Sequence, residues 1–129
     1  MAPLCNETTE RFNIITKFAF ATSVGHQPNN PYKQNQDAYI IQPNLLGHLG
    51  LHLFGICDGH GLHGHSVSNF IKDNLSSKIM QQTPINLIQS KNISKTEQLY
   101  SKVPCILHNS FNQVNNDLRK QKHFDTQLR

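Results

Sequence analysis

No run of apolar residues in this sequence approaches the roughly 20 that a membrane-spanning helix needs. The first residues, Met1 to Glu7, lack the apolar core of a secretory signal peptide. Ala2 stands where N-myristoylation requires glycine. These absences argue against a membrane anchor and against export. We therefore expect an intracellular protein of the cytoplasm or nucleus, without a transmembrane segment.

Cysteines are few and odd in number: Cys5, Cys57 and Cys105. Their spacing shows no pairs, whereas a disulfide framework in a small secreted protein needs an even set. We therefore expect reduced thiols, which agrees with an intracellular location.

Acidic residues are also sparse, with 8 against 12 lysines and arginines, so the formal net charge is +4. The basic residues are scattered except for Arg119, Lys120 and Lys122. No aromatic residues alternate with this cluster, as they would on a surface that stacks bases. We interpret the cluster as the solvated end of a helix and expect no nucleic-acid partner.

The 129 residues can bury one modest hydrophobic core, and their apolar content of 36% is low for a compact domain. We expect a monomer with one domain, or part of one, rather than two. We expect residues 1–12 to be a loose N-terminal segment and the domain to occupy residues 13–129.

The clearest chemistry begins at the end of a predicted strand, Leu51–Cys57, which has a single polar member and is expected to be buried on both faces. Asp58 follows directly, beside glycines that permit a sharp turn and a close approach to a ligand. His60 lies two residues further on, where an imidazole suits proton transfer beside a cation. Asp-Gly is also a common turn signal, but the histidine favours a metal site.

A second carboxylate, Asp37, begins another short segment whose β-branched and aromatic residues, 38–41, favour a strand. A short connection with a turn at 47–50 leads to the next strand, so the two strands should pair antiparallel. Antiparallel pairing brings the start of the first strand and the end of the second to one edge. Asp37, Asp58 and His60 should therefore converge there.

Residues 14–20 alternate as an edge strand would. Apolar residues at helical spacing predict a helix from about Ser66 to Gln81, with Ser68 on its polar face, stopped before Pro84. Residues 82–92 should form a link.

A capping-box pattern at Ser94–Glu97 can start a further helix, which Pro104 should kink or interrupt. The apolar stripe from Leu107 to Leu118 then continues as a helix.

The segment Phe54–Gly61, preceded by Asn35–Ala38 and followed by an amphipathic helix, resembles the start of the metal-dependent protein phosphatases, the PPM or protein phosphatase 2C family. The resemblance covers most of residues 14–126 and only the first part of the family's domain. It implies an α+β fold, a partial antiparallel β-sandwich flanked by helices. Residues 13–129 would be the N-terminal part of that domain, truncated before the remaining strands.

This resemblance implies a protein serine/threonine phosphatase that hydrolyses phosphoserine and phosphothreonine in phosphoproteins, using water that bridges two Mg²⁺ or Mn²⁺ ions. By position, Asp58 corresponds to the metal-bridging aspartate and Gly59 to the glycine whose backbone oxygen ligates a metal. Asp37 corresponds to the carboxylate that orients metal-bound water, and His60 to the general acid.

Two residues depart from the family pattern. Gln36 stands where many members carry glutamate, and its amide can still hold a water at the metal site. The usual phosphate-binding arginine falls at Tyr32, and Lys33 beside it can replace the arginine as a point charge. The remaining metal-binding aspartates of the family lie further along its domain, so we expect this chain to be an incomplete fragment.

Two alternatives remain open. The chain could be a non-catalytic, truncated phosphatase-like protein that acts by interaction. It could instead hold Zn²⁺, which imidazole and thiolate ligands suit, through a set drawn from Cys57, His60, His63 and His65, with His48 and His52 upstream.

Overall fold

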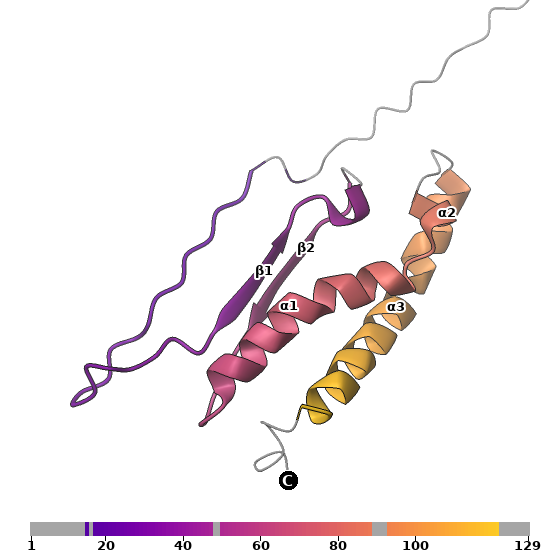
Figure 1. Ribbon diagram of the computed structural model, residues 1–129. Coiled ribbons are helices and arrows are strands. Elements are labelled where there is room, and N and C mark those ends of the chain that lie inside the picture. Colours follow the sequence, from indigo (N-terminus) through magenta and orange to yellow (C-terminus); the bar gives the residue numbers. More distant parts are fainter. Residues whose placement is uncertain (1–14, 16, 48–49, 89–92, 122–129) are drawn as a thin grey trace, which may run out of the picture.

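The computed structural model describes residues 15, 17–47, 50–88 and 93–121. Within these ranges the chain forms a two-stranded sheet, a short 3₁₀ helix and three α-helices (Figure 1). The order of elements is β1 (Ala38–Gln42), η1 (Leu45–Gly47), β2 (Leu53–Cys57), α1 (Gly64–Gln82), α2 (Ile85–Ile88) and α3 (Ile93–Arg119). The expected α+β class is confirmed. No helix in the described ranges combines the length and the apolar character that crossing a bilayer requires.

The sheet is the antiparallel hairpin that the sequence predicts. Ala38 lies opposite Cys57, and Gln42 lies opposite Leu53. Strand β2 begins two residues later than expected. The connection includes η1, where Leu46 and Gly47 adopt φ values of 59° and 71°.

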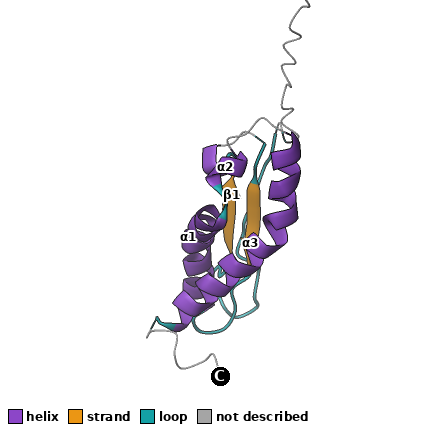
Figure 2. Cartoon of the chain, turned by 90° about the vertical axis from the view of Figure 1, so that its right-hand side faces the viewer, coloured by secondary structure: helices purple, strands orange, loops and turns teal. Residues whose placement is uncertain are grey.

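Helix α1 packs against one face of the sheet, and α3 packs on α1 (Figure 2). The core forms between these layers. Ile40 on β1, Ile79 on α1 and Val114 on α3 are each 5% exposed or less. Burial of each such side chain contributes about 1.5–3 kcal/mol, so these contacts hold the hairpin on the helix pair.

The expectation that β2 is buried on both faces is wrong. Ile56 is 80% exposed and Phe54 is 41% exposed, because their side chains point away from α1. Successive side chains of a strand alternate between the two faces, and α1 covers only one of them. The hairpin therefore presents an apolar outer face.

The strand expected over residues 14–20 is not formed at residues 15 and 17–20, which have no ladder hydrogen bonds. The segment instead runs along the outer side of the hairpin (Figure 1). The Phe18 ring is tilted against that of Phe54 with centroids 5.3 Å apart, and the Phe20 ring centroid lies 4.7 Å from that of Tyr39. Phe18 and Phe20, which the alternating pattern puts on one side of the segment, thus both contact the hairpin although the backbone forms no strand.

Helix α1 agrees with its expected bounds to within two residues, but the assignment of Ser68 to the polar face is wrong. Ser68 is 1% exposed, because this position of α1 faces the loop that precedes β1. There its hydroxyl donates a hydrogen bond to the backbone carbonyl of Gln36.

Of the two outcomes expected at Pro104, a kink or an interruption, the interruption is wrong, since α3 continues through this residue. Proline removes the bond to the carbonyl four residues earlier, here that of Tyr100. Pro104 and Tyr100 are both exposed, so water can satisfy that carbonyl. The expected link at residues 82–92 contains the single-turn helix α2.

Candidate functional site

The two carboxylates predicted to converge belong to segments that meet at one edge of the sheet. Asp37 immediately precedes β1 and Asp58 immediately follows β2, and the register places Ala38 opposite Cys57. The Gly59 N–H donates to Asp37 Oδ1 at 3.3 Å. Both aspartates and His60 are exposed, so their polar groups are accessible to a ligand.

Asn35 orients Asp37. Its Nδ2 donates to Thr22 Oγ1 at 2.7 Å, and its Oδ1 accepts the Asp37 N–H at 3.0 Å. The second bond is the local pattern by which an asparagine side chain caps the backbone two residues on. Asn35 was not predicted as a site residue, although an asparagine two residues before a candidate ligand is a recognisable signal.

The turn after Asp58 folds tightly onto the chain before β1. A Cβ atom on Gly59 would lie 2.2 Å from the Gln36 carbonyl oxygen and 2.6 Å from that of Gly64. A Cβ atom on Gly64 would lie 2.7 Å from the Gly59 carbonyl carbon. No side chain fits at such distances, so both glycines are required for the close approach of β1, the turn and α1.

Gln36 holds this turn in place. Its Nε2 donates to the Gly61 carbonyl at 2.8 Å, and its own carbonyl accepts a hydrogen bond from Ser68 Oγ. Ser68 thereby ties the start of α1 to the loop that carries Asp37. This role of Ser68 could not be read from the sequence, because its acceptor lies 32 residues away along the chain.

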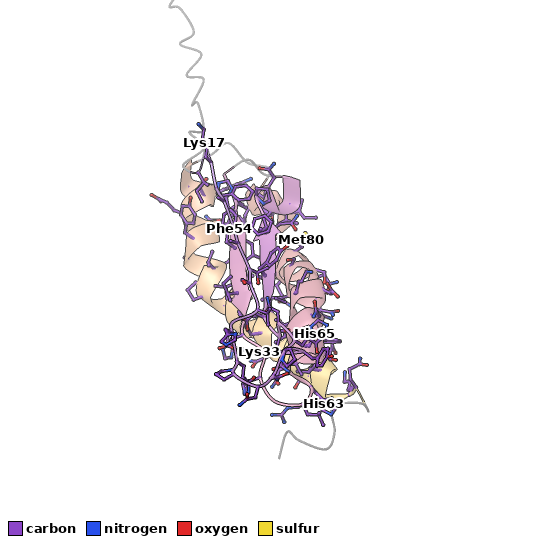
Figure 3. All side chains as sticks on the ribbon, turned by 90° about the vertical axis from the view of Figure 1, so that its left-hand side faces the viewer. Lys17, Lys33, Phe54, His63, His65 and Met80 are labelled. Carbon is purple, nitrogen blue, oxygen red and sulfur yellow. The ribbon has the colours of Figure 1, made fainter. Side chains whose placement is uncertain are left out.

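A polar cavity of about 160 Å³ lies beside the turn. Its lining includes four of the six predicted site residues, Lys33, Gln36, Asp37 and Gly59, together with residues 23–25, 34 and 35. Asp58 and His60 are not part of this lining but neighbour Gly59 in the chain. Lys33, His63 and His65 all lie at this end of the molecule (Figure 3).

Cys57, the last residue of β2, is held as a neutral thiol. Burial raises its pKa above the ordinary value of 9.0, and the nearby Lys72 ammonium offsets part of that rise. A thiolate is the form that binds metal, so this environment disfavours Cys57 as a zinc ligand.

The described residues contain no group of three histidine, cysteine or acidic side chains close enough to hold a metal ion. These residues therefore give no support to the zinc alternative. His48, one of its candidate ligands, lies outside the described residues. The oxygen donors of Asp37, Asp58 and the Gly59 carbonyl are of the kind that Mg²⁺ and Mn²⁺ prefer. They are fewer than the six ligands of a hard dication.

The chain is similar in sequence to protein phosphatases of the 2C type. It is 45% identical over 61 residues to the Arabidopsis thaliana "Probable protein phosphatase 2C 35", an alignment that covers 47% of this chain and 18% of that protein. It is 26% identical over 98 residues to the Arabidopsis thaliana "Probable protein phosphatase 2C 65", covering 71% of this chain and 26% of that protein. The chain thus spans about a quarter or less of each relative's length. No family profile and no solved structure matches it.

Proposed function

We propose that this chain is part of a metal-dependent protein serine/threonine phosphatase, with residues 13–129 forming the N-terminal part of its domain. The observation that carries the proposal is the hydrogen bond from the Gly59 N–H to Asp37 Oδ1. It joins the segment that ends in Asp37 to the turn that begins with Asp58, at one edge of the sheet and beside a polar cavity. The similarity to two Arabidopsis proteins named as probable protein phosphatases supports the class of enzyme.

Asp58 and the Gly59 carbonyl would hold Mg²⁺ or Mn²⁺, two ions in all, with further ligands from outside the described residues. Asp37 would orient a metal-bound water. When bound, the ions lower the pKa of that water and neutralise charge on the phosphoryl group. Gln36 holds the turn in position through the hydrogen bond from its Nε2 to the Gly61 carbonyl.

The substrates are phosphoserine and phosphothreonine side chains of proteins. Lys33 lines the same cavity as Asp37, so its ammonium would attract phosphoryl oxygens as a point charge. His60 follows Gly59 on the turn and would donate a proton to the departing serine or threonine oxygen.

The outer face of the hairpin would be the interior of a β-sandwich. An apolar cavity of about 440 Å³ lies there, lined by residues that include Ile15, Phe18, Ile41, Phe54 and Ile56. A second sheet packs at about 10 Å from the first in such folds and would bury these side chains.

Replacement of the bridging carboxylate tests the proposal. Asp58→Asn keeps the side-chain volume but removes the charge that two cations would share. In the longest natural product that contains this chain, we expect the variant to lose measurable hydrolysis of a phosphoserine peptide with either Mg²⁺ or Mn²⁺. The matched control is Asp73→Asn on the exposed side of α1, which should retain turnover. Normal turnover in Asp58→Asn would contradict the proposal.

The leaving group tests the role of His60. A general acid accelerates a reaction by about 10²–10⁴-fold, and a poor leaving group needs it most. We expect His60→Ala to slow phosphoserine hydrolysis by about a hundredfold or more, and aryl phosphate hydrolysis far less. Equal losses on both substrates would exclude proton donation by His60.

A non-catalytic interaction protein is the second candidate, favoured by the small number of oxygen donors that the described residues bring together. A natural product of this chain's length that hydrolyses no phosphopeptide with either metal would establish it. Turnover by such a product would reject it.

A further inference from the structure

The chain before β1 runs along the outer side of the hairpin and then turns back toward that strand (Figure 1). Two turns fold this connection. The Asn30 N–H donates to the Gln27 carbonyl at 3.2 Å, and the Lys33 N–H donates to the Asn30 carbonyl at 3.3 Å. Thr22 on the first part thereby lies beside Asn35 on the returning part, 13 residues later. A side chain of the first part can therefore act on the residues that lead into β1.

Thr22 and Asp37 contact the two ends of one amide, that of Asn35. Asn35 Nδ2 donates to Thr22 Oγ1 at 2.7 Å, and Asn35 Oδ1 accepts the Asp37 N–H at 3.0 Å. The reverse orientation of the amide would set its NH₂ group against the Asp37 N–H, so that two donors faced each other. One orientation thus satisfies both neighbours, and the Thr22 hydroxyl supplies the acceptor for its second end.

The bond to Thr22 matters because Asn35 is only half-buried. Water competes for hydrogen bonds at such a position, so a side chain held at one end keeps part of its rotational freedom. A side chain held at both ends has a single orientation, as residues that support a site require. Thr22 itself is kept within reach by the aromatic contact of Phe20 with Tyr39, whose ring centroids are 4.7 Å apart.

We propose that Thr22 is a positioning residue, which acts through Asn35 to fix the direction of the Asp37 carboxylate. The Gly59 N–H donates to Asp37 Oδ1 at 3.3 Å, so the carboxylate is held from the turn as well as from its own backbone. Residues 23–25, which follow Thr22, line the same polar cavity as Asp37. The effect on turnover rests on the proposed phosphatase function, in which Asp37 orients a water.

Two substitutions at Thr22 separate its hydroxyl from its shape. Thr22→Val keeps the β-branched shape and removes the acceptor, whereas Thr22→Ser keeps the hydroxyl. By NMR on the full chain, we expect Thr22→Val to speed hydrogen exchange of the Asp37 N–H by about fivefold and to shift the Asn35 side-chain amide protons. Thr22→Ser should leave both signals as in the natural chain. Unchanged Asp37 exchange in Thr22→Val, or equal changes in the two variants, would overturn the proposal.

Two further variants test the path. Ser23→Ala removes a neighbouring hydroxyl, which donates to the Val24 carbonyl at 3.4 Å, and should leave the Asp37 exchange rate unchanged. In an Asn35→Ala background, Thr22→Val should have no additional effect, because the connection is already broken. An effect of Ser23→Ala as large as that of Thr22→Val, or an undiminished effect of Thr22→Val in the Asn35→Ala background, would exclude action through Asn35.

Turnover gives a separate readout in the longest natural product that contains this chain. Thr22→Val should lower kcat for a phosphoserine peptide by about three- to tenfold and leave KM within about twofold, because Asp37 orients water and does not bind the peptide. Thr22→Ser should restore kcat. An undiminished kcat in Thr22→Val would overturn the role in turnover. If the natural product hydrolyses no phosphopeptide, the proposed function fails, and the Asp37 exchange rate still decides whether Thr22 fixes this aspartate.

Discussion

At Gly59 the turn after β2 lies close to both the chain before β1 and the start of α1. A Cβ atom there would approach two backbone carbonyl oxygens, at 2.2 and 2.6 Å, neither of which can move as a side chain could. Overpacking of this kind costs about 1–3 kcal/mol. We expect Gly59→Ala to lower the free energy of unfolding by about that amount, measured by urea denaturation, and to reduce any phosphatase activity.

Gly55→Ala is the matched control for this prediction. A Cβ atom at Gly55 would lie 3.5 Å from Ile40 Cδ1, an ordinary contact. Because glycine in a strand interior is entropically unfavourable, this variant should be as stable as the natural chain or slightly more stable. Equal stability of Gly59→Ala and Gly55→Ala would mean that the turn relaxes without cost.

Residues whose partners are close in sequence were predicted well, and those whose partners are distant were not. The convergence of Asp37 and Asp58 follows from one hairpin. The burial of Ser68 depends on the carbonyl of Gln36, which helical periodicity cannot reveal. Which face of β2 is buried also could not be read from its apolar pattern, because the exposure of Ile56 depends on what covers its face.

At the scale of elements, α1 and α3 are joined by an ion pair in addition to their apolar contacts. Lys78 Nζ lies 2.9 Å from Asp117 Oδ2, and Lys120 Nζ lies 3.4 Å from Oδ1. The hydrogen bond from Lys78, followed by that from Lys120, lowers the pKa of Asp117 below its ordinary value of 3.8. These contacts give a structural role to Asp117, which lies in α3 directly before Leu118, the last residue of the apolar stripe.

The lowered pKa predicts how acid affects the helix pair. The folded state favours ionised Asp117, so its contribution to stability is present above about pH 4, where the unfolded carboxyl is also ionised. That contribution is lost as the pH falls through the folded pKa. We expect Asp117→Asn to be less stable than the natural chain at pH 7 and to lose less stability on acidification, measured by urea unfolding at pH 7 and pH 3.

Asp73→Asn, on the exposed side of α1, serves as the control because it also removes one carboxylate. It should change the pH dependence less than Asp117→Asn does. If acid changes the stability of both variants equally, the ion pair is not the source of the pH dependence.

At the scale of the whole molecule, helices cover only one side of the hairpin, and residues 17–20 run along the other side. Phe18, Phe20, Phe54 and Ile56 are between 41% and 80% exposed on the other side. Contiguous apolar surface of this kind marks an interaction face. The proposed β-sandwich would account for this surface, because the exposed residues would become core if a second sheet packed against them.

This explanation gives opposite expectations for one substitution in two settings. Ile56→Thr keeps the β-branched shape that suits a strand and removes apolar area. The chain of residues 1–129 alone should self-associate through the uncovered face, and Ile56→Thr should weaken that association in sedimentation velocity. Ile85→Thr, at an exposed position on α2, should not. In a longer natural product with the proposed second sheet, Ile56 would be buried, so the same change should lower the unfolding free energy by about 0.5–3 kcal/mol. A longer product that is as stable with threonine as with isoleucine would place this face outside the sandwich core and remove the physical basis for the proposed fold.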